Sequence, residues 1–161
     1  MGTDPEFRFS MPLRVRWAEC DPQGVVFNAT YLAYCDHALT EYFRAIGVPY
    51  REYVAAGHDM VLVTTTVDYH APARPDDDLT ILCRIGDFGD TSWSMWVVAR
   101  NGETPVMSAR SRYVTVDGAG RKQTTPDLLR DAVARFEAGQ PPDGRGVIAS
   151  QRVDAPSPKS S

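Results

Sequence analysis

Apolar and polar residues alternate along five segments of the chain, which is the pattern of half-buried β-strands. In the first, residues 8–17, apolar side chains occupy every second position from Phe9 to Trp17, and Arg14 and Arg16 lie between them. The other four predicted strands span residues 60–70, 79–85, 92–100 and 106–116. Turn-forming residues separate these four at 72–78, 86–90 and 101–102. Strands that follow one another as hairpins require an antiparallel sheet.

A helical pattern covers residues 25–46, beginning with a short first turn. Its apolar positions fall at helical spacing and extend around most of the helix; they include Leu32, Cys35, Leu39, Phe43 and Ile46, widened by neighbouring tyrosines and alanines. Such a helix is buried by more than one neighbour. Gly47 and Pro49 end it, and shorter helices are predicted at 50–56 and 126–137. The sequence therefore predicts an α+β domain in which a curved five-stranded antiparallel sheet wraps around a long central helix.

Composition narrows the class of protein. A chain of 161 residues suits one domain, here 8–138, with residues 1–7 typical of a cloning remnant and 139–161 of a flexible tail. A net charge of −4 without a basic stripe disfavours nucleic-acid binding, and no apolar run approaches a membrane span. Three widely spaced cysteines fit reduced thiols in a cytoplasm and fit no metal motif.

The stretch that carries candidate chemistry precedes the long helix. Asp21 lies in a Pro/Gly loop, and the first turn of a helix offers unpaired N–H groups and a partial positive charge. A carboxylate there can attack an acyl group or deprotonate a water molecule while the N–H groups hold a developing oxyanion. Gly24 would let the backbone approach a ligand closely. The alternative is that Asp21 is only a turn or capping residue.

Several motifs together resemble the 4-hydroxybenzoyl-CoA thioesterase family of hot-dog fold proteins. They are Glu-Cys-Asp-Pro-Gln-Gly-Val-Val-Phe-Asn at 19–28, Tyr31, Asp36, Gly-Val-Pro at 47–49 and the Pro/Asp-rich run at 71–79. The resemblance covers residues 8–136. It implies a hot-dog fold, hydrolysis of acyl-CoA thioesters without a cofactor, and homodimers or homotetramers whose active sites lie between subunits.

The resemblance also assigns roles to residues. Asp21 matches the catalytic carboxylate, and the backbone N–H of Asn28 matches the donor that polarises the thioester carbonyl. Asp36 matches a carboxylate that accepts the phenol of a hydroxybenzoyl substrate, although a solvated helix residue is an equal reading. Tyr31 is a candidate for the wall of the acyl pocket, and Thr65, with its threonine neighbours, for a hydroxyl that positions water.

Two departures from the family keep alternatives open. Asn28 stands where some members carry a histidine, and the turn at 86–90 is acidic where some carry a basic cluster for the phosphates of CoA. Arg74, Arg110, Arg112 or Lys122 would then hold these phosphates, or the acyl carrier is an acyl carrier protein. A non-catalytic module that binds acyl thioesters or acyl carrier protein is the alternative function, whereas the His–acid pair of a hot-dog dehydratase has no match.

Overall fold

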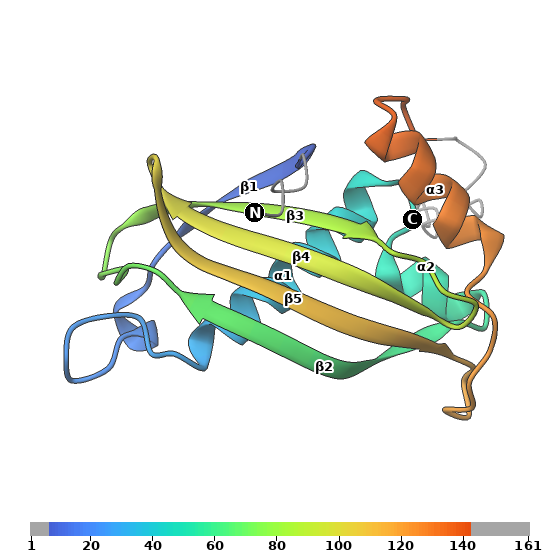
Figure 1. The fold of residues 1–161 in the computed structure, drawn as a ribbon, viewed down its shortest axis with the longest axis horizontal. Coiled ribbons are helices and arrows are strands. Elements are labelled where there is room, and N and C mark those ends of the chain that lie inside the picture. Colours follow the sequence, from blue (N-terminus) through green and yellow to red (C-terminus); the bar gives the residue numbers. More distant parts are fainter. Residues whose placement is uncertain (1–6, 143–161) are drawn as a thin grey trace, which may run out of the picture.

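The computed structural model describes residues 7–142 of the chain. Residues 1–6 of the predicted cloning remnant and residues 143–161 of the predicted tail lie outside these residues. Five strands form one antiparallel sheet in the order β1-β3-β4-β5-β2 (Figure 1). Their bounds are β1 Phe9–Arg14, β2 Asp59–Tyr69, β3 Asp78–Gly86, β4 Ser92–Asn101 and β5 Thr104–Val116. All five alternating segments are therefore strands, with bounds within about three residues of those predicted.

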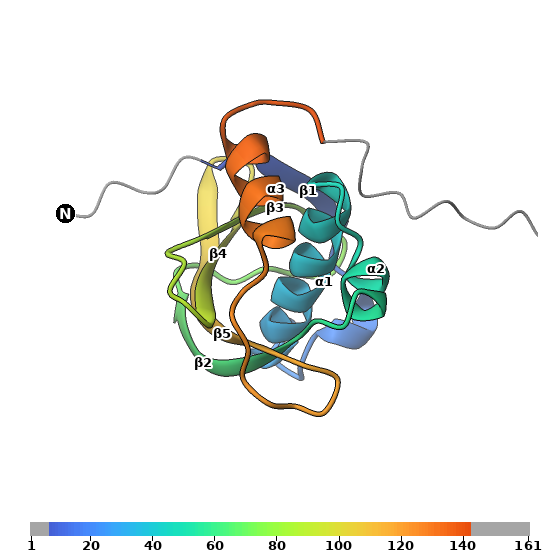
Figure 2. The same cartoon turned by 90° about the vertical axis from the view of Figure 1, so that its right-hand side faces the viewer.

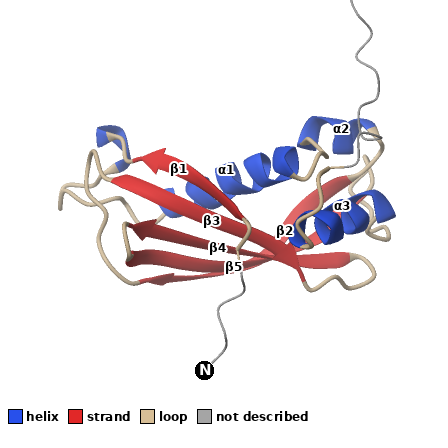
Figure 3. Cartoon of the chain, turned by 90° about the horizontal axis from the view of Figure 1, so that it is seen from above, coloured by secondary structure: helices blue, strands red, loops and turns tan. Residues whose placement is uncertain are grey.

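The sheet curves around the central helix α1, Thr30–Ala45, as Figures 2 and 3 show from two further sides. Gly47 follows α1 with a positive φ of 79°, a conformation that favours glycine, and Pro49 precedes α2, Tyr50–Ala55. The C-terminal helix α3, Asp127–Glu137, packs at the end of the sheet where α1 ends. There the hydroxyl of Tyr42 donates a hydrogen bond of 2.6 Å to the Glu137 carboxylate.

The two faces of the sheet differ in what they carry. The face toward α1 holds the core, including the fully buried Trp93 and Met95 of β4 and the nearly buried Tyr113 of β5. Because directly paired residues share a face, the register Thr64↔Arg112↔Ser94 places these three side chains on the opposite face. The strands therefore separate an apolar inner face from a polar outer one.

Three details of the predicted pattern are wrong. Trp17 is 73% exposed because β1 ends at Arg14, and a 3₁₀ turn, η1, Trp17–Glu19, directs its indole outward to Asp76. The helix begins at Thr30 and not at residue 25. Leu32 is 43% exposed because the buried positions of α1 run through 31, 34, 35, 38, 39, 42 and 43, and position 32 falls outside that stripe.

Candidate active site

The Asp21 loop is a compact turn that backbone hydrogen bonds close. The Asp21 N–H donates to the Val25 carbonyl, and the Gly24 N–H donates to the Asp21 carbonyl, each at 2.9 Å. Gly24 has a φ of +73°, which a residue with a side chain adopts only with strain. One carboxylate oxygen of Asp21 accepts the Gln23 N–H at 2.8 Å. The other accepts no hydrogen bond from the described residues and is available to a ligand.

Asn28 lies in a turn that leads into α1. The Thr30 N–H donates to the Phe27 carbonyl at 2.9 Å, so Asn28 occupies the second position of that turn. The Asn28 N–H donates to no described residue, whereas its carbonyl accepts the hydroxyl of Tyr69 at 2.9 Å. This bond ties the turn to the end of β2. The N–H predicted as an oxyanion donor is therefore free in a turn that both α1 and β2 hold in place.

Asp21, Asn28 and Tyr31 line one open pocket of about 400 Å³. Its remaining lining consists of residues 23 and 25–27 of the loop, and of Tyr69 at the end of β2 with residues 70–72 after it. Tyr31 is 3% exposed and contacts the rings of Tyr34 and Tyr69 edge-on at 5.6 Å. The structure thus brings the predicted carboxylate, the predicted N–H donor and the predicted pocket wall together in one chain.

Glu19 fastens this loop to α1. Its carboxylate accepts the Tyr34 hydroxyl at 2.7 Å and the Arg16 N–H at 2.8 Å. Partial burial acts to raise the pKa of Glu19, but these hydrogen bonds and the Arg16 charge outweigh it and hold the pKa below its usual range. Glu19 is therefore an ionised anchor between the loop and α1.

Cys20 adjoins Asp21, which raises the question of a thiol nucleophile. Desolvation, with the charges of Glu19 and Asp21, raises the pKa of the Cys20 thiol. Cys20 is therefore a poor nucleophile, because the reactive form of cysteine is the thiolate.

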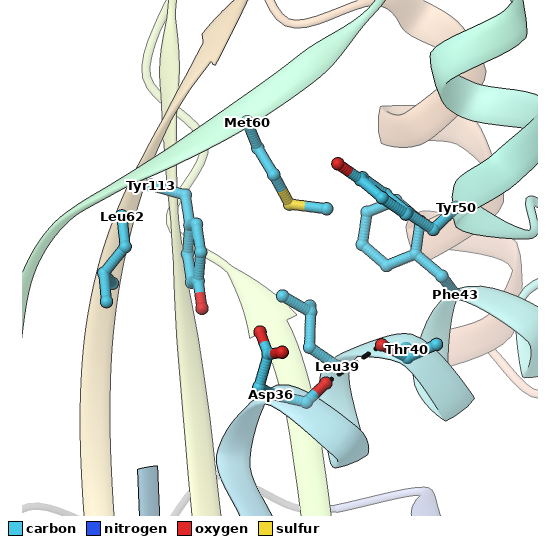
Figure 4. A pocket seen from close by; sticks show the side chains of 8 residues that line it. All are labelled: Asp36, Leu39, Thr40, Phe43, Tyr50, Met60, Leu62 and Tyr113. Atoms are coloured by element: carbon cyan, nitrogen blue, oxygen red, sulfur yellow. Dashed lines mark hydrogen bonds between the residues drawn. The ribbon is translucent and has the colours of Figure 1, made fainter. Parts of the chain in front are cut away.

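Asp36 lies in a second pocket, of about 290 Å³, between α1, α2, β2 and β5 (Figure 4). The carboxylate of Asp36 and the hydroxyl of Tyr113 face the same end of this space, and its other walls are mainly apolar. Burial and the Asp36 charge raise the pKa of Tyr113, which remains a protonated hydrogen-bond donor. The Tyr113 ring stacks on the buried Trp93 with centroids 4.6 Å apart and is thereby fixed.

α2 closes one side of this second pocket through Tyr50. The Tyr50 hydroxyl donates a hydrogen bond of 2.7 Å to Asp59 at the start of β2, which raises the pKa of Tyr50 to about 12. The Asp36 pocket and the Asp21 pocket share no lining residue within one chain.

The other predicted site residues lie outside both pockets. Gly24 forms the loop but does not line the Asp21 pocket. The Thr65 hydroxyl is hydrogen-bonded to Ser111 at 2.8 Å between β2 and β5. Arg74 is exposed in the loop before β3, and Arg112 lies on the outer face of the sheet, bound to Ser92 and Ser94. Their roles toward substrate remain predictions.

His70 is a pocket residue that the pattern of the sequence did not single out. It lines the Asp21 pocket, and its Nε2 is hydrogen-bonded to the Ser108 hydroxyl at 2.8 Å. Its sequence neighbours show only a strand ending before a proline-rich turn. Only the hydrogen bonds from Tyr69 to the Asn28 carbonyl and from the Val26 N–H to the Ala73 carbonyl show that this strand end lies beside the Asp21 loop.

A curved five-stranded antiparallel sheet around one central helix is the hot-dog fold. The chain belongs to the thioesterase-like superfamily, whose family model matches residues 15–143. It is 37% identical to the acyl-CoA thioester hydrolase YbgC of Escherichia coli over 130 residues, which are 80% of this chain and 96% of the relative. It is 26% identical to the acyl-acyl carrier protein thioesterase ATL3 of Arabidopsis thaliana, covering 77% of this chain but only 66% of that longer protein.

Solved structures agree with this membership. A thioesterase from Thermus thermophilus, crystallised with coenzyme A and zinc, superposes with a TM-score of 0.72 at 25% identity, covering 86% of this chain and 99% of that one. The predicted hot-dog fold, the thioesterase family and the class of enzyme, a thioester hydrolase, are confirmed. Among the described residues, no group of three or more histidine, cysteine or acidic side chains could hold a metal ion. No helix in that part of the chain is long and apolar enough to cross a membrane.

Proposed function

We propose that the protein is an acyl-CoA thioesterase in which Asp21 supplies the attacking group and the Asn28 N–H holds the oxyanion. The observation that carries this proposal is that the second carboxylate oxygen of Asp21 and the Asn28 N–H border the same pocket, and neither is hydrogen-bonded to a residue within 7–142. The names of the relatives, several of them acyl-CoA thioester hydrolases, support the choice of carrier.

The chemistry requires few groups. A thioester carbonyl becomes an oxyanion when it is attacked, and one preorganised N–H donor contributes about 3 kcal/mol, a factor of 10²–10³ in rate. Asp21 either attacks the carbonyl carbon to form a mixed anhydride or removes a proton from an attacking water molecule. The departing thiolate is a good leaving group, so a Ser-His-Asp triad is not needed.

A second copy of the chain would complete the substrate site. β2 is an edge strand, and it exposes apolar side chains at Val61, Leu62, Val63 and Tyr69. Antiparallel pairing of two β2 edges about a two-fold axis would set the Leu62 end of one copy against the Tyr69 end of the other. The Asp36 pocket of one subunit would then adjoin the Asp21 pocket of its partner, in a homodimer that can pair further into a homotetramer.

The Asp36 pocket would receive the acyl group. Its apolar walls suit an aryl or short aliphatic chain, and the Asp36 carboxylate would accept a hydrogen bond from a hydroxyl at the far end of a hydroxybenzoyl group.

The cysteines bear on where the protein works. Three free cysteines, Cys20, Cys35 and Cys83, are consistent with a reducing cytoplasm.

The alternative function is an acyl-thioester or acyl-carrier-protein binding module on the same fold, without turnover. The acidic turn between β3 and β4, with Asp87 and Asp90, favours it because it provides no phosphate-binding cluster there. The resemblance to a plant acyl-acyl carrier protein thioesterase keeps the carrier protein in consideration as the acyl carrier.

The test is a hydrolysis panel of benzoyl, hydroxybenzoyl and aliphatic thioesters of coenzyme A and of acyl carrier protein, followed by release of free thiol. The wild-type chain is expected to turn over at least one CoA thioester, and Asp21→Ala to lose 10²- to 10⁴-fold in kcat with an unchanged circular dichroism spectrum. Binding of the thioesters without turnover across the panel would favour the module, and full activity in Asp21→Ala would exclude the proposed chemistry.

A further inference from the structure

A line of polar cavities runs along the outer face of the sheet, the face that Figure 1 presents to the reader. One, of about 420 Å³, is lined by Thr66, Asp68, Trp96, Ser108 and Arg110, among others. The next, of about 340 Å³, shares Thr66 and Arg110 with it and adds further hydroxyl groups and Arg112. The two cavities therefore adjoin at Thr66 and Arg110, and together they form a groove over β4 and β5 beside β2.

The groove begins where the Asp21 pocket ends. His70 lines the Asp21 pocket, and its hydrogen bond to Ser108 joins that pocket to the first of the outer cavities. The side chains of Thr64, Thr66 and Asp68 follow one another on the same face of β2, because alternate residues of a strand share a face, and His70 comes directly after the strand. This row of side chains leads from the Asp21 pocket to the guanidinium groups of Arg110 and Arg112.

The length of this row fits the arm of an acyl carrier. Thr66 lies four residues from His70, about 13 Å along a strand. A pantetheine arm has about a dozen bonds between its sulfur and its first phosphate, which is roughly the length of four extended residues. A thioester sulfur held beside His70, in the Asp21 pocket, would therefore bring the phosphate level with Thr66 and Arg110.

The charged side chains at the end of the groove away from the Asp21 pocket suit a phosphate. Arg110 lies over the Trp96 ring at 5.4 Å, and its side chain is 60% exposed; Asp87 holds it through an ion pair of 3.0 Å. Arg112 is tied down, donating to the Asp87 carbonyl and to the hydroxyls of Ser92 and Ser94. Arg110 is thus the adaptable cation, Arg112 the fixed one, and the Asp87 carboxylate competes with an incoming phosphate.

We infer that this groove binds the phosphopantetheine arm of the acyl carrier, with its phosphate at Arg110 and Arg112. The inference rests on the proposed function and moves the phosphate site from the turn between β3 and β4 to strand β5. Asp68, Ser108 and Thr66 offer hydrogen-bonding groups to the amides of the arm, and Asp87 tunes the affinity by holding Arg110.

Carrier preference tests the inference. The same acyl group is presented as a thioester of pantetheine, which has no phosphate, of coenzyme A and of acyl carrier protein. We expect Arg110→Gln to lower the ratio of kcat/KM for the CoA thioester to that for the pantetheine thioester roughly tenfold, because a charged hydrogen bond to phosphate is lost. Asp87→Asn, which tolerates the positive φ of 49° at that position, is expected to raise the ratio.

Arg51→Gln is the matched control, because Arg51 is an exposed arginine of α2 away from the groove and should keep the wild-type ratio. An unchanged ratio in Arg110→Gln for both CoA and carrier protein overturns the inference. An equal loss on all three thioesters together with a smaller assembly in light scattering also overturns it, since the groove would then be a contact between copies of the chain. A loss confined to the carrier-protein thioester supports the groove and identifies the carrier.

Failure of the proposed function would be visible separately. Binding of coenzyme A itself, measured by titration calorimetry, needs no hydrolysis. A tenfold weaker binding by Arg110→Gln in a protein that hydrolyses none of the thioesters would support the groove and reject the hydrolase. Turnover that depends on Asp21, with CoA binding that does not depend on Arg110, would support the hydrolase and reject the groove.

Discussion

The two pockets beside α1 are built in opposite ways. The Asp21 pocket is formed mainly by loops, and its key groups, Asp21, Asn28 and Tyr31, come from eleven consecutive residues. The Asp36 pocket is formed by the sides of helices and strands, and its lining reaches from Asp36 to Tyr113 along the chain.

This difference assigns the hydrolysis step to the Asp21 pocket and the choice of acyl group to the Asp36 pocket. A short turn can fix a carboxylate and an N–H relative to each other with few contacts, here through Glu19 and Tyr69. A cavity shaped for an acyl group needs walls from several packed elements, because only their packing fixes its width. Changes in the loop should therefore alter turnover, and changes in the Asp36 pocket should alter the choice of substrate.

Removing the Asn28 N–H should have the largest effect among the changes that test this division. Asn28→Pro lacks the donor, and proline is favoured at the second position of a turn, so the fold should tolerate it. We expect kcat to fall 10²- to 10³-fold. Asn28→Ala, which keeps the N–H, is the control, and an equal loss in both variants would show that the side chain and not the backbone matters.

Neutralising Asp36 should change selectivity. Asp36→Asn is expected to lower kcat/KM for hydroxybenzoyl-CoA about tenfold relative to benzoyl-CoA, because the substrate hydroxyl loses a charged acceptor. Competition between the two thioesters measures this ratio directly. His37→Gln, on the neighbouring exposed position of α1, should leave the ratio unchanged. An equal loss of kcat on both thioesters would instead show that Asp36 takes part in hydrolysis and not in the selection of the acyl group.

Removing the Glu19 anchor should weaken the loop in a pH-dependent way. Because the folded state holds the pKa of Glu19 below its usual value, its stabilising effect is present at neutral pH and is lost as pH falls through the folded pKa. Glu19→Gln should lower the free energy of unfolding by about 1 kcal/mol at pH 7, with a smaller difference below about pH 4. Denaturant unfolding at several pH values measures it, and a difference that grows on acidification would contradict the sign.

Backbone strain at Gly24 should have an equally small effect, confined to stability. A Cβ added there meets nothing within 4 Å, so Gly24→Ala should cost only the strain of a positive φ, about 1 kcal/mol. Gly118 has equally open space and no positive φ, and Gly118→Ala should cost less. Equal melting temperatures for the two variants would mean that the loop adapts without strain.

The sequence predicted features that contiguous residues determine. Alternation located all five strands, and Gly47 with Pro49 located the end of α1, because each depends on local geometry. The Asp21 loop was predictable for the same reason. The start of α1 was not, because residues 25–29 have helical apolar spacing but form the bridge and turn that carry Asn28.

Long-range pairing accounts for what the sequence left open. Asp36 follows Asp21 by fifteen positions, yet only the folded chain shows that they line different pockets. His70 and the outer-face groove depend on the register of β2 with β5, which alternation alone does not specify. Trp17 continued a period-two pattern past the residue where pairing with β3 ends.

The central claim is that one carboxylate, Asp21, carries the hydrolysis. The most direct measurement is kcat of Asp21→Asn on the wild-type enzyme's preferred thioester at saturating concentration, with its melting temperature measured in parallel. We expect kcat to fall 10²- to 10⁴-fold while the melting temperature changes by only a few degrees. A stably folded Asp21→Asn variant with the kcat of the wild type would contradict the account.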